Sequence, residues 1–211
     1  LGAEPGGESA YARGKAAGEA AVLAAFPSAV ILRPSVVFGD GDGFFRKFAG
    51  MARMFPVLPI INPKTRFQPV YVDDVAAAVV ASVTGDAAGV YELGGPEAKT
   101  FEELMRQMLA VIRRRRPVVA IPGWLARLQA SVLDKAQGLS FGLFTNTVVT
   151  RDQLKLLGRD NVVAPGARGF ADLGITDLTV METVLDSYLY AFRPHGQYDT
   201  IKESAERLWN R

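Results

Sequence analysis

The chain has 211 residues, of which 49% are hydrophobic and 22% charged, a composition typical of a soluble domain with a sizeable core. It contains no cysteine and one histidine, which excludes disulfides, thiolate metal sites and His-rich metal sites. The formal net charge of +2 is too small to indicate nucleic-acid binding, and no apolar stretch reaches the roughly 18 residues of a membrane-spanning helix.

The first predicted elements are a helix and a buried strand. Residues 9–26 are rich in alanine and end before Pro27, which predicts a helix packed closely against a sheet. The apolar run Ala29-Val30-Ile31-Leu32 has no polar alternation, which is typical of a parallel strand covered on both faces. We expect Pro34 to end this strand and to free the next backbone groups for contact with a bound ring.

Strands and helices continue to alternate downstream. After a glycine-rich turn at residues 39–43, we expect a helix over residues 44–54 and a short strand over residues 67–72. Residues 89–95 then read as a further strand closed by glycines. This alternation predicts an α/β protein with a parallel sheet.

Two helix starts are marked by polar residues. Asp73 and Asp74 open an alanine- and valine-rich helix that we expect to reach about residue 83. The pair could serve as acid/base carboxylates, but a helix cap and first turn explain it better. Thr100 and Glu103 have the spacing of a capping box, which predicts a helix to about residue 112.

The segment after Pro117 has a looser pattern, and we expect no strand in it. Residues 117–150 form either a small substrate lobe or an apolar patch that faces a membrane or a partner. Residues 180–192 and 201–209 predict two later helices, and His195 between them is expected in a solvated loop.

Basic residues gather in two places. We interpret them as a solvated helix end and a solvated loop, with docking onto an acidic partner or an anionic lipid as the alternative. They are the run Arg113 to Arg116, and the set Arg46, Lys47, Arg53, Lys64 and Arg66.

Tyr11 and Lys15 form the first candidate for chemistry. Four residues apart in a helix, they project from one face, one turn apart. An ammonium beside a phenol favours the phenolate, so such a tyrosine can act as a general acid or base near neutral pH. The pattern alone is weak, but a buried strand follows the helix directly, and ligands of doubly wound sheets lie beyond the carboxyl ends of strands.

Four motifs in order resemble those of extended and atypical short-chain dehydrogenases, the NAD-dependent epimerase/dehydratase family. They are Tyr11-Ala12-Arg13-Gly14-Lys15, Leu32-Arg33-Pro34-Ser35-Val36-Val37-Phe38-Gly39, Pro69-Val70-Tyr71-Val72-Asp73-Asp74-Val75-Ala76 and Tyr91-Glu92-Leu93-Gly94-Gly95-Pro96. The resemblance implies the C-terminal part of a doubly wound, Rossmann-like parallel sheet with a small, mostly helical C-terminal lobe.

Within that family the chain is similar to proteins related to the nucleotide-binding accessory subunit of respiratory complex I. This closer likeness covers nearly the whole chain. It rests on Ala25-Phe26-Pro27, Thr150-Arg151-Asp152-Gln153, Asp160-Asn161-Val162-Val163, Ala171-Asp172-Leu173-Gly174-Ile175 and Phe192-Arg193-Pro194.

The resemblance assigns roles to five residues. Tyr11 matches the acid/base tyrosine of the family, and Lys15 matches the lysine that holds the nicotinamide ribose. Pro34, Ser35 and Val36 match the segment that lies against the nicotinamide carboxamide. These residues are our predicted catalytic and cofactor-binding set, for NAD or NADP with NADPH favoured.

Two family features would precede Leu1, namely the glycine-rich phosphate loop and the Ser or Thr that completes the catalytic set. Ser9 is too close to Tyr11 to replace the latter. We therefore expect an N-terminally truncated chain that binds dinucleotide poorly by itself. Its expected division is residues 1–116, the C-terminal half of the nucleotide-binding domain with inserted lobe elements, and residues 117–211, a helical lobe or interaction segment.

Two functional hypotheses follow from the resemblance. The first is an NAD(P)H-binding accessory or assembly subunit of complex I, or of the quinone-biosynthesis machinery. It would lie at the periphery of the inner membrane, on the bacterial cytoplasmic or the matrix side, without a nucleic-acid partner. The alternative is an active NAD(P)-dependent epimerase, dehydratase or reductase that uses Tyr11 as acid/base on a nucleotide sugar or an isoprenoid-like ketone.

Overall fold

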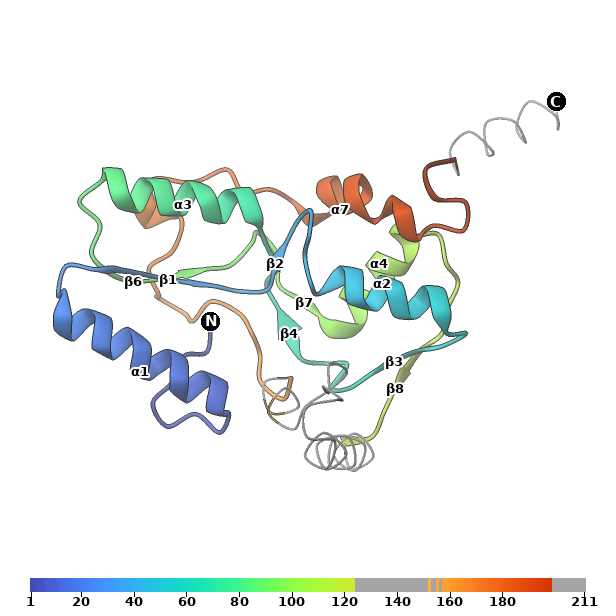
Figure 1. The fold of residues 1–211 in the computed structure, drawn as a ribbon, viewed down its shortest axis with the longest axis horizontal. Coiled ribbons are helices and arrows are strands. Elements are labelled where there is room, and N and C mark those ends of the chain that lie inside the picture. Colours follow the sequence, from blue (N-terminus) through green and yellow to red (C-terminus); the bar gives the residue numbers. More distant parts are fainter. Residues whose placement is uncertain (124–151, 153–154, 156, 199–211) are drawn as a thin grey trace, which may run out of the picture.

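The computed structural model describes residues 1–123, 152, 155 and 157–198, and these residues form an α/β structure (Figure 1). None of the helices in this described part is long and apolar enough to cross a membrane. The elements are α1 (Ala10–Ala25), β1 (Val30–Pro34), β2 (Val37–Phe38), α2 (Phe45–Met54), β3 (Leu58–Ile60), β4 (Arg66–Phe67), β5 (Val70–Tyr71), α3 (Val72–Thr84), β6 (Gly89–Leu93), β7 (Lys99–Thr100), α4 (Phe101–Val111), β8 (Val118–Ala120), η1 (Ala171–Leu173), α7 (Met181–Leu189), η2 (Tyr190–Phe192) and η3 (Gly196–Tyr198).

Parallel strands lie between two helices that are rich in small residues. β1 pairs in parallel with β6 over all five residues, and β2 pairs in parallel with β5. Figure 1 shows α1 on one side of the β1–β6 pair and α3 on the other. Ala12 and Ala16 of α1 and Ala78 of α3 are buried, because alanine lets a helix backbone approach a sheet closely. The predicted parallel α/β arrangement is confirmed.

A second strand pair corrects the expectation that no strand follows Pro117. β8 pairs in parallel with β3, and the Leu58 N–H donates to the Pro117 carbonyl at 2.9 Å. The Ile121 N–H donates to the Ile60 carbonyl at 2.7 Å. Both strands have three residues, and β3 contains Pro59, so neither shows a period in the sequence. Their pairing is set by the packing of the chain.

The single strand expected over residues 67–72 is also corrected, because it is two strands in different pairs. β4 pairs antiparallel with β7, whereas β5 belongs with β2. The break falls at Gln68 and Pro69, where the chain passes close to Gly95. A Cβ built on Gly95 would lie 1.9 Å from the Pro69 carbonyl oxygen, so this approach requires glycine.

The larger hydrophobic core lies among α2, α4 and α7. The predicted helix over residues 180–192 is α7 followed by the 3-10 turn η2, while the helix expected over residues 201–209 lies outside the described residues. α7 packs into the same core as residues before position 116. The fully buried side chains of this core include Phe45, Leu104, Met105, Met108, Leu185 and Leu189.

The arginine run at residues 113–116 is not simply solvated, as we had interpreted it. Arg114 Nε donates to the Phe192 carbonyl at 2.8 Å, and Arg116 Nε donates to the Ala52 carbonyl at 3.1 Å. A third hydrogen bond joins the same segments: Arg193 Nε donates to the carbonyl of Val111, the last residue of α4, at 3.1 Å. These guanidinium groups therefore join the C-terminal part of the chain to α4 and α2.

Candidate functional site

A cavity of about 510 Å³ lies beyond the carboxyl end of β1, which is where α/β sheets bind their ligands. Its volume falls within the range of roughly 300–1,000 Å³ that is usual for small-molecule sites. α1, the end of β1, α2, β3 and residues 155–161 contribute to its wall. Tyr11, Pro34, Ser35 and Val36 of the predicted set line it, and Lys15 does not.

The start of α1 is held by a distant segment. The Ser9 hydroxyl accepts from the Ala12 N–H at 2.9 Å and caps the start of α1. The Asp152 carboxylate accepts from the N–H groups of Ala10 at 2.8 Å and Tyr11 at 3.1 Å. Lys155 Nζ donates to the Glu8 carbonyl at 3.1 Å. Tyr11 is thus positioned by a segment that begins about 140 residues downstream.

Tyr11 and Lys15 contact each other as their spacing predicts. Lys15 Nζ lies 5.6 Å from the centroid of the Tyr11 ring, over its face. The Tyr11 side chain is 56% exposed and contributes to the cavity wall. Lys15 itself is exposed and does not line the cavity.

Pro34 does not release the following residues from the strand ladder, contrary to our expectation. Pro34 lies opposite Leu93, and the Ser35 N–H donates to the Leu93 carbonyl at 2.9 Å. The Val36 carbonyl then accepts from the Val70 N–H at 3.0 Å. β1 does end at Pro34 as expected, and Ser35 and Val36 connect it to β2, whose partner is β5 instead of β6.

Asn161 fixes the Ser35 side chain, a contact that sequence reasoning missed. The buried Ser35 hydroxyl donates to Asn161 Oδ1 at 2.6 Å and lies 3.0 Å from the Asn161 carbonyl oxygen. The Asn161 N–H donates to the Arg66 carbonyl at 2.7 Å. Asn161 and Asp152 both stand in motifs of the family resemblance, but nothing local in the sequence indicates their partners.

The described helix N-termini are unsuited to a pyrophosphate, because each has a carboxylate in or beside its first turn. Phe45 N–H, for example, donates to Asp42 Oδ1 at 2.6 Å. The acidic residues are Asp152 at α1, Asp42 at α2, Asp73 and Asp74 in α3, Glu102 and Glu103 in α4, and Glu182 in α7. Among the described residues, no helix N-terminus therefore offers a pyrophosphate site free of a competing carboxylate.

Asp73 and Asp74 stand at the start of α3 as expected, but neither is the cap residue. The cap of α3 is Tyr71, and both carboxylates lie in its first turn. Asp74 is 9% exposed and accepts from Thr179, from the N–H at 2.8 Å and from the hydroxyl at 3.0 Å. It joins α3 to the approach to α7. The predicted capping box of α4 is confirmed, with Thr100 and Glu103 in both reciprocal bonds.

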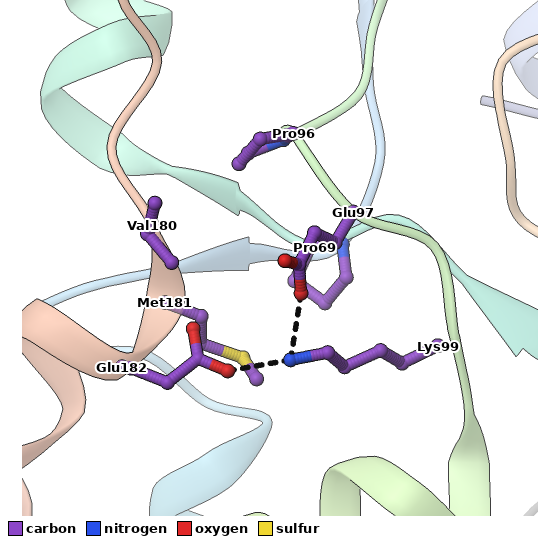
Figure 2. Close-up of a pocket in the computed structure, with 7 residues that line it drawn as sticks. All are labelled: Pro69, Pro96, Glu97, Lys99, Val180, Met181 and Glu182. Carbon is purple, nitrogen blue, oxygen red and sulfur yellow. Dashed lines mark hydrogen bonds and ion pairs between the residues drawn. The ribbon is translucent and has the colours of Figure 1, made fainter.

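A second, much smaller pocket is a structural ion-pair site (Figure 2). Lys99 Nζ lies 2.8 Å from Glu97 Oε2 and 2.5 Å from Glu182 Oε1, so the lysine ties β7 to α7. The pocket volume of about 10 Å³ leaves room for one water molecule at most. No group of three or more His, Cys, Asp or Glu side chains in the described residues could hold a metal ion, and His195 lies exposed in a turn.

Comparison with protein families identifies the class of fold. The sequence model described as the RmlD substrate binding domain matches residues 2–147. Solved structures show the same architecture: an epimerase from Methanothermobacter thermautotrophicus has 18% identity and a TM-score of 0.61, covering 92% of this chain and 52% of that one. The UDP-glucose 4-epimerase of Thermus thermophilus, in complex with NAD, has 15% identity and a TM-score of 0.57, covering 92% and 60%. The Rossmann-like fold is confirmed.

Curated relatives share more sequence. NADH dehydrogenase (ubiquinone) 1 alpha subcomplex subunit 9, mitochondrial, of Arabidopsis thaliana is 37% identical over 180 residues, which is 83% of this chain and 45% of the relative. The NADH-ubiquinone oxidoreductase 40 kDa subunit, mitochondrial, of Neurospora crassa is 30% identical over 97% of this chain and 53% of the relative. A ceramide reductase of Caulobacter vibrioides is 35% identical over 54% of this chain and 37% of its own. The chain spans about half the length of the two mitochondrial relatives.

Proposed function

The chain belongs to the family of the RmlD substrate binding domain, within the epimerase/dehydratase-like short-chain dehydrogenases, and from this we propose that it is part of an accessory or assembly subunit of respiratory complex I. The observation that supports this most strongly is the similarity to two mitochondrial NADH dehydrogenase subunits over 83% and 97% of the chain. Fold alone would not distinguish a subunit from an enzyme, whereas identity of 30–37% to named subunits favours the subunit.

We propose NAD(P)H as the bound nucleotide, with NADPH favoured over NADH. Its nicotinamide would lie against Pro34, Ser35 and Val36 at the carboxyl end of β1, with Tyr11 beside it and Lys15 on the ribose. A nicotinamide supplies hydride transfer when bound. The hydrogen bond from Ser35 to Asn161 holds this segment in place, and Asp152 holds the helix that presents Tyr11.

The proposed location is the periphery of the inner membrane, on the matrix side or on the bacterial cytoplasmic side. Complex I subunits are the proposed partners, and proteins of quinone biosynthesis are the second choice. Residues 124–150, the greater part of the segment expected to form a substrate lobe or an apolar docking surface, lie outside the described residues. The division at residue 116 and the role of this segment remain predictions.

The experiment is affinity purification of the full-length protein from native membranes in mild detergent. We expect complex I subunits to co-purify with the protein. Denaturation of the purified protein should release one NADPH per chain, and ketones added to the protein before denaturation should not oxidise this nucleotide. Recovery of the full-length protein without any respiratory subunit would contradict the proposal. The Tyr11→Phe variant should still co-purify with complex I subunits, because an accessory role needs no proton donor.

Activity as an NAD(P)-dependent oxidoreductase or epimerase is the second candidate, favoured by the position of Tyr11 on the cavity wall next to the end of β1. The name of the Caulobacter relative, a ceramide reductase, supports it as well. Tyr11→Phe removes the proton donor with little change in packing, so turnover should fall by about 10²–10⁴-fold. Unchanged turnover in this variant would exclude Tyr11 as the acid/base.

A further inference from the structure

Four phenylalanines line the cavity and are here called the aromatic wall: Phe44, Phe48, Phe67 and Phe101. Neighbouring rings pack edge to face, with centroids 5.4 Å apart for Phe44 and Phe48 and 5.3 Å apart for Phe48 and Phe101. Phe67 and Phe101 are almost fully buried, so they anchor the wall in the core of α2 and α4. Phe44 and Phe48 are half-buried and line the cavity.

Aliphatic side chains complete the enclosure. Ile60 and Ile61 come from β3 and the residue after it, Met51 from α2, Ile121 from the end of β8, and Leu157 from the following segment. The polar lining near Tyr11, from Ser9 and Ser35, lies at the end next to α1 and β1. The lining is thus polar beside Tyr11 and the end of β1, and mainly apolar along the aromatic wall, β3 and the residue after β8.

The charges around the cavity are already engaged by the protein. Arg159 lies 2.5 Å from the Glu4 carboxylate, Lys155 donates to the Glu8 carbonyl, and Lys47 also has a partner within the protein. Asp160 accepts from the Arg66 N–H at 2.8 Å. A diphosphate would compete with these partners and would meet the carboxylates of Glu4, Glu8 and Asp160, so a neutral ligand is favoured over a nucleotide sugar.

We propose that this cavity binds a neutral amphiphile with a long apolar chain, a long-chain ketone or alcohol, whose chain lies along the aromatic wall and whose oxygen lies toward Tyr11. This inference rests on the proposed function for the direction of the head group, because Tyr11 and the end of β1 define the nucleotide end. The chain site itself rests only on the aromatic wall, the aliphatic enclosure and the paired charges.

The test uses full-length, nucleotide-loaded protein and a homologous series of straight-chain methyl ketones, with binding measured by calorimetry. Burial of each added methylene should raise the affinity about fourfold until the chain fills the cavity, after which the affinity should level off. Affinity that does not depend on chain length, or displacement of a long ketone by UDP-glucose, would overturn the proposal.

Two variants separate the site from general hydrophobicity. Phe48→Gln places an amide on the aromatic wall. It should lower the affinity for the longest ketone about tenfold or more and leave the affinity for short ketones unchanged. Val80→Gln, on the exposed face of α3, is the control and should leave every affinity unchanged. If Phe48→Gln does not fold, Met51→Gln on the half-buried cavity face of α2 replaces it.

Nucleotide content and complex I association are measured on the same samples. Loss of both with ketone binding intact would refute the proposed function and leave the chain site standing. Absence of ketone binding in protein that retains nucleotide and assembles would refute the chain site alone. A wall variant that binds every ketone as the unchanged protein does would also refute it.

Discussion

Asp152→Ala tests whether the distant carboxylate holds the helix that presents Tyr11. The substitution removes both acceptors of the Ala10 and Tyr11 N–H groups, at 2.8 and 3.1 Å, and leaves the Ser9 cap in place. Loss of a helix cap costs about 0.5–2 kcal/mol, and loss of a charge at a helix N-terminus costs about 0.3–1 kcal/mol. We expect a loss of about 1–2 kcal/mol in the free energy of unfolding, or roughly 2–8 °C in Tm for a chain of this size.

The assay is urea denaturation, combined with hydrogen exchange at the first turn of α1. The amides of Ala10 and Tyr11 should lose protection in the variant, whereas amides of β6 should keep it. Asp152→Asn retains one acceptor without the charge. Its free energy of unfolding should lie between those of the unchanged protein and Asp152→Ala. Asp86→Ala is the control, since this exposed carboxylate lies in the turn after α3 and should change stability by less than about 0.5 kcal/mol. If Asp152→Ala is as stable as Asp86→Ala and equally protected, the positioning argument is refuted.

The other predictions concern packing, pairing and pH. Asp74→Ala leaves the Thr179 N–H without its acceptor and should lower the free energy of unfolding by about 1–3 kcal/mol, whereas Thr179→Val, which removes only the hydroxyl, should lower it by about 1 kcal/mol; equal losses in urea denaturation would contradict this account. Phe101→Ala removes a ring that is 1% exposed, so it should lower the free energy of unfolding by roughly 3–5 kcal/mol and lower the urea midpoint accordingly. A loss below about 1 kcal/mol would mean that the aromatic wall is not anchored in the core. The hydrogen bonds from the Thr100 side chain and N–H hold the pKa of Glu103 below its usual 4.5, so this group stabilises the fold above that pH and loses its contribution as the pH falls through the lowered value. Glu103→Gln should therefore flatten the stability profile between neutral pH and about pH 3, and an unchanged profile would show that the capping box does not contribute to acid sensitivity.

Local sequence patterns were sufficient for α1, β1 and the start of α4. The alanine-rich helix with its Ser9 start and the Thr100–Glu103 capping box depend on residues within one or two turns of each other, and the structure has both. The apolar run of β1 predicted a parallel strand, because such a strand needs apolar residues on both faces. The order of helix and strand also placed Tyr11 and residues 34–36 at one end of the sheet, where the cavity lies.

Tertiary packing decided everything that depends on distant residues. β3 and β8 are three residues long, too short for any periodic signal, and each exists because the other lies beside it. Asp74 looked like a helix cap from its neighbours but bonds to Thr179, 105 residues away. Lys15 keeps its helical contact with Tyr11 but does not line the cavity, because the packing of α1 decides which of its residues reach the cavity and the spacing alone does not.

The sequence by itself thus determined the fold class, the helix ends and the family of the chain, because these depend on short-range periodicity and on ordered motifs. Only the tertiary structure showed that Asp152 holds the start of α1 and that four phenylalanines from three segments line the same cavity. Such contacts join residues that are independent in sequence, and their free energy comes from burial and hydrogen bonding that exist only once the chain has folded.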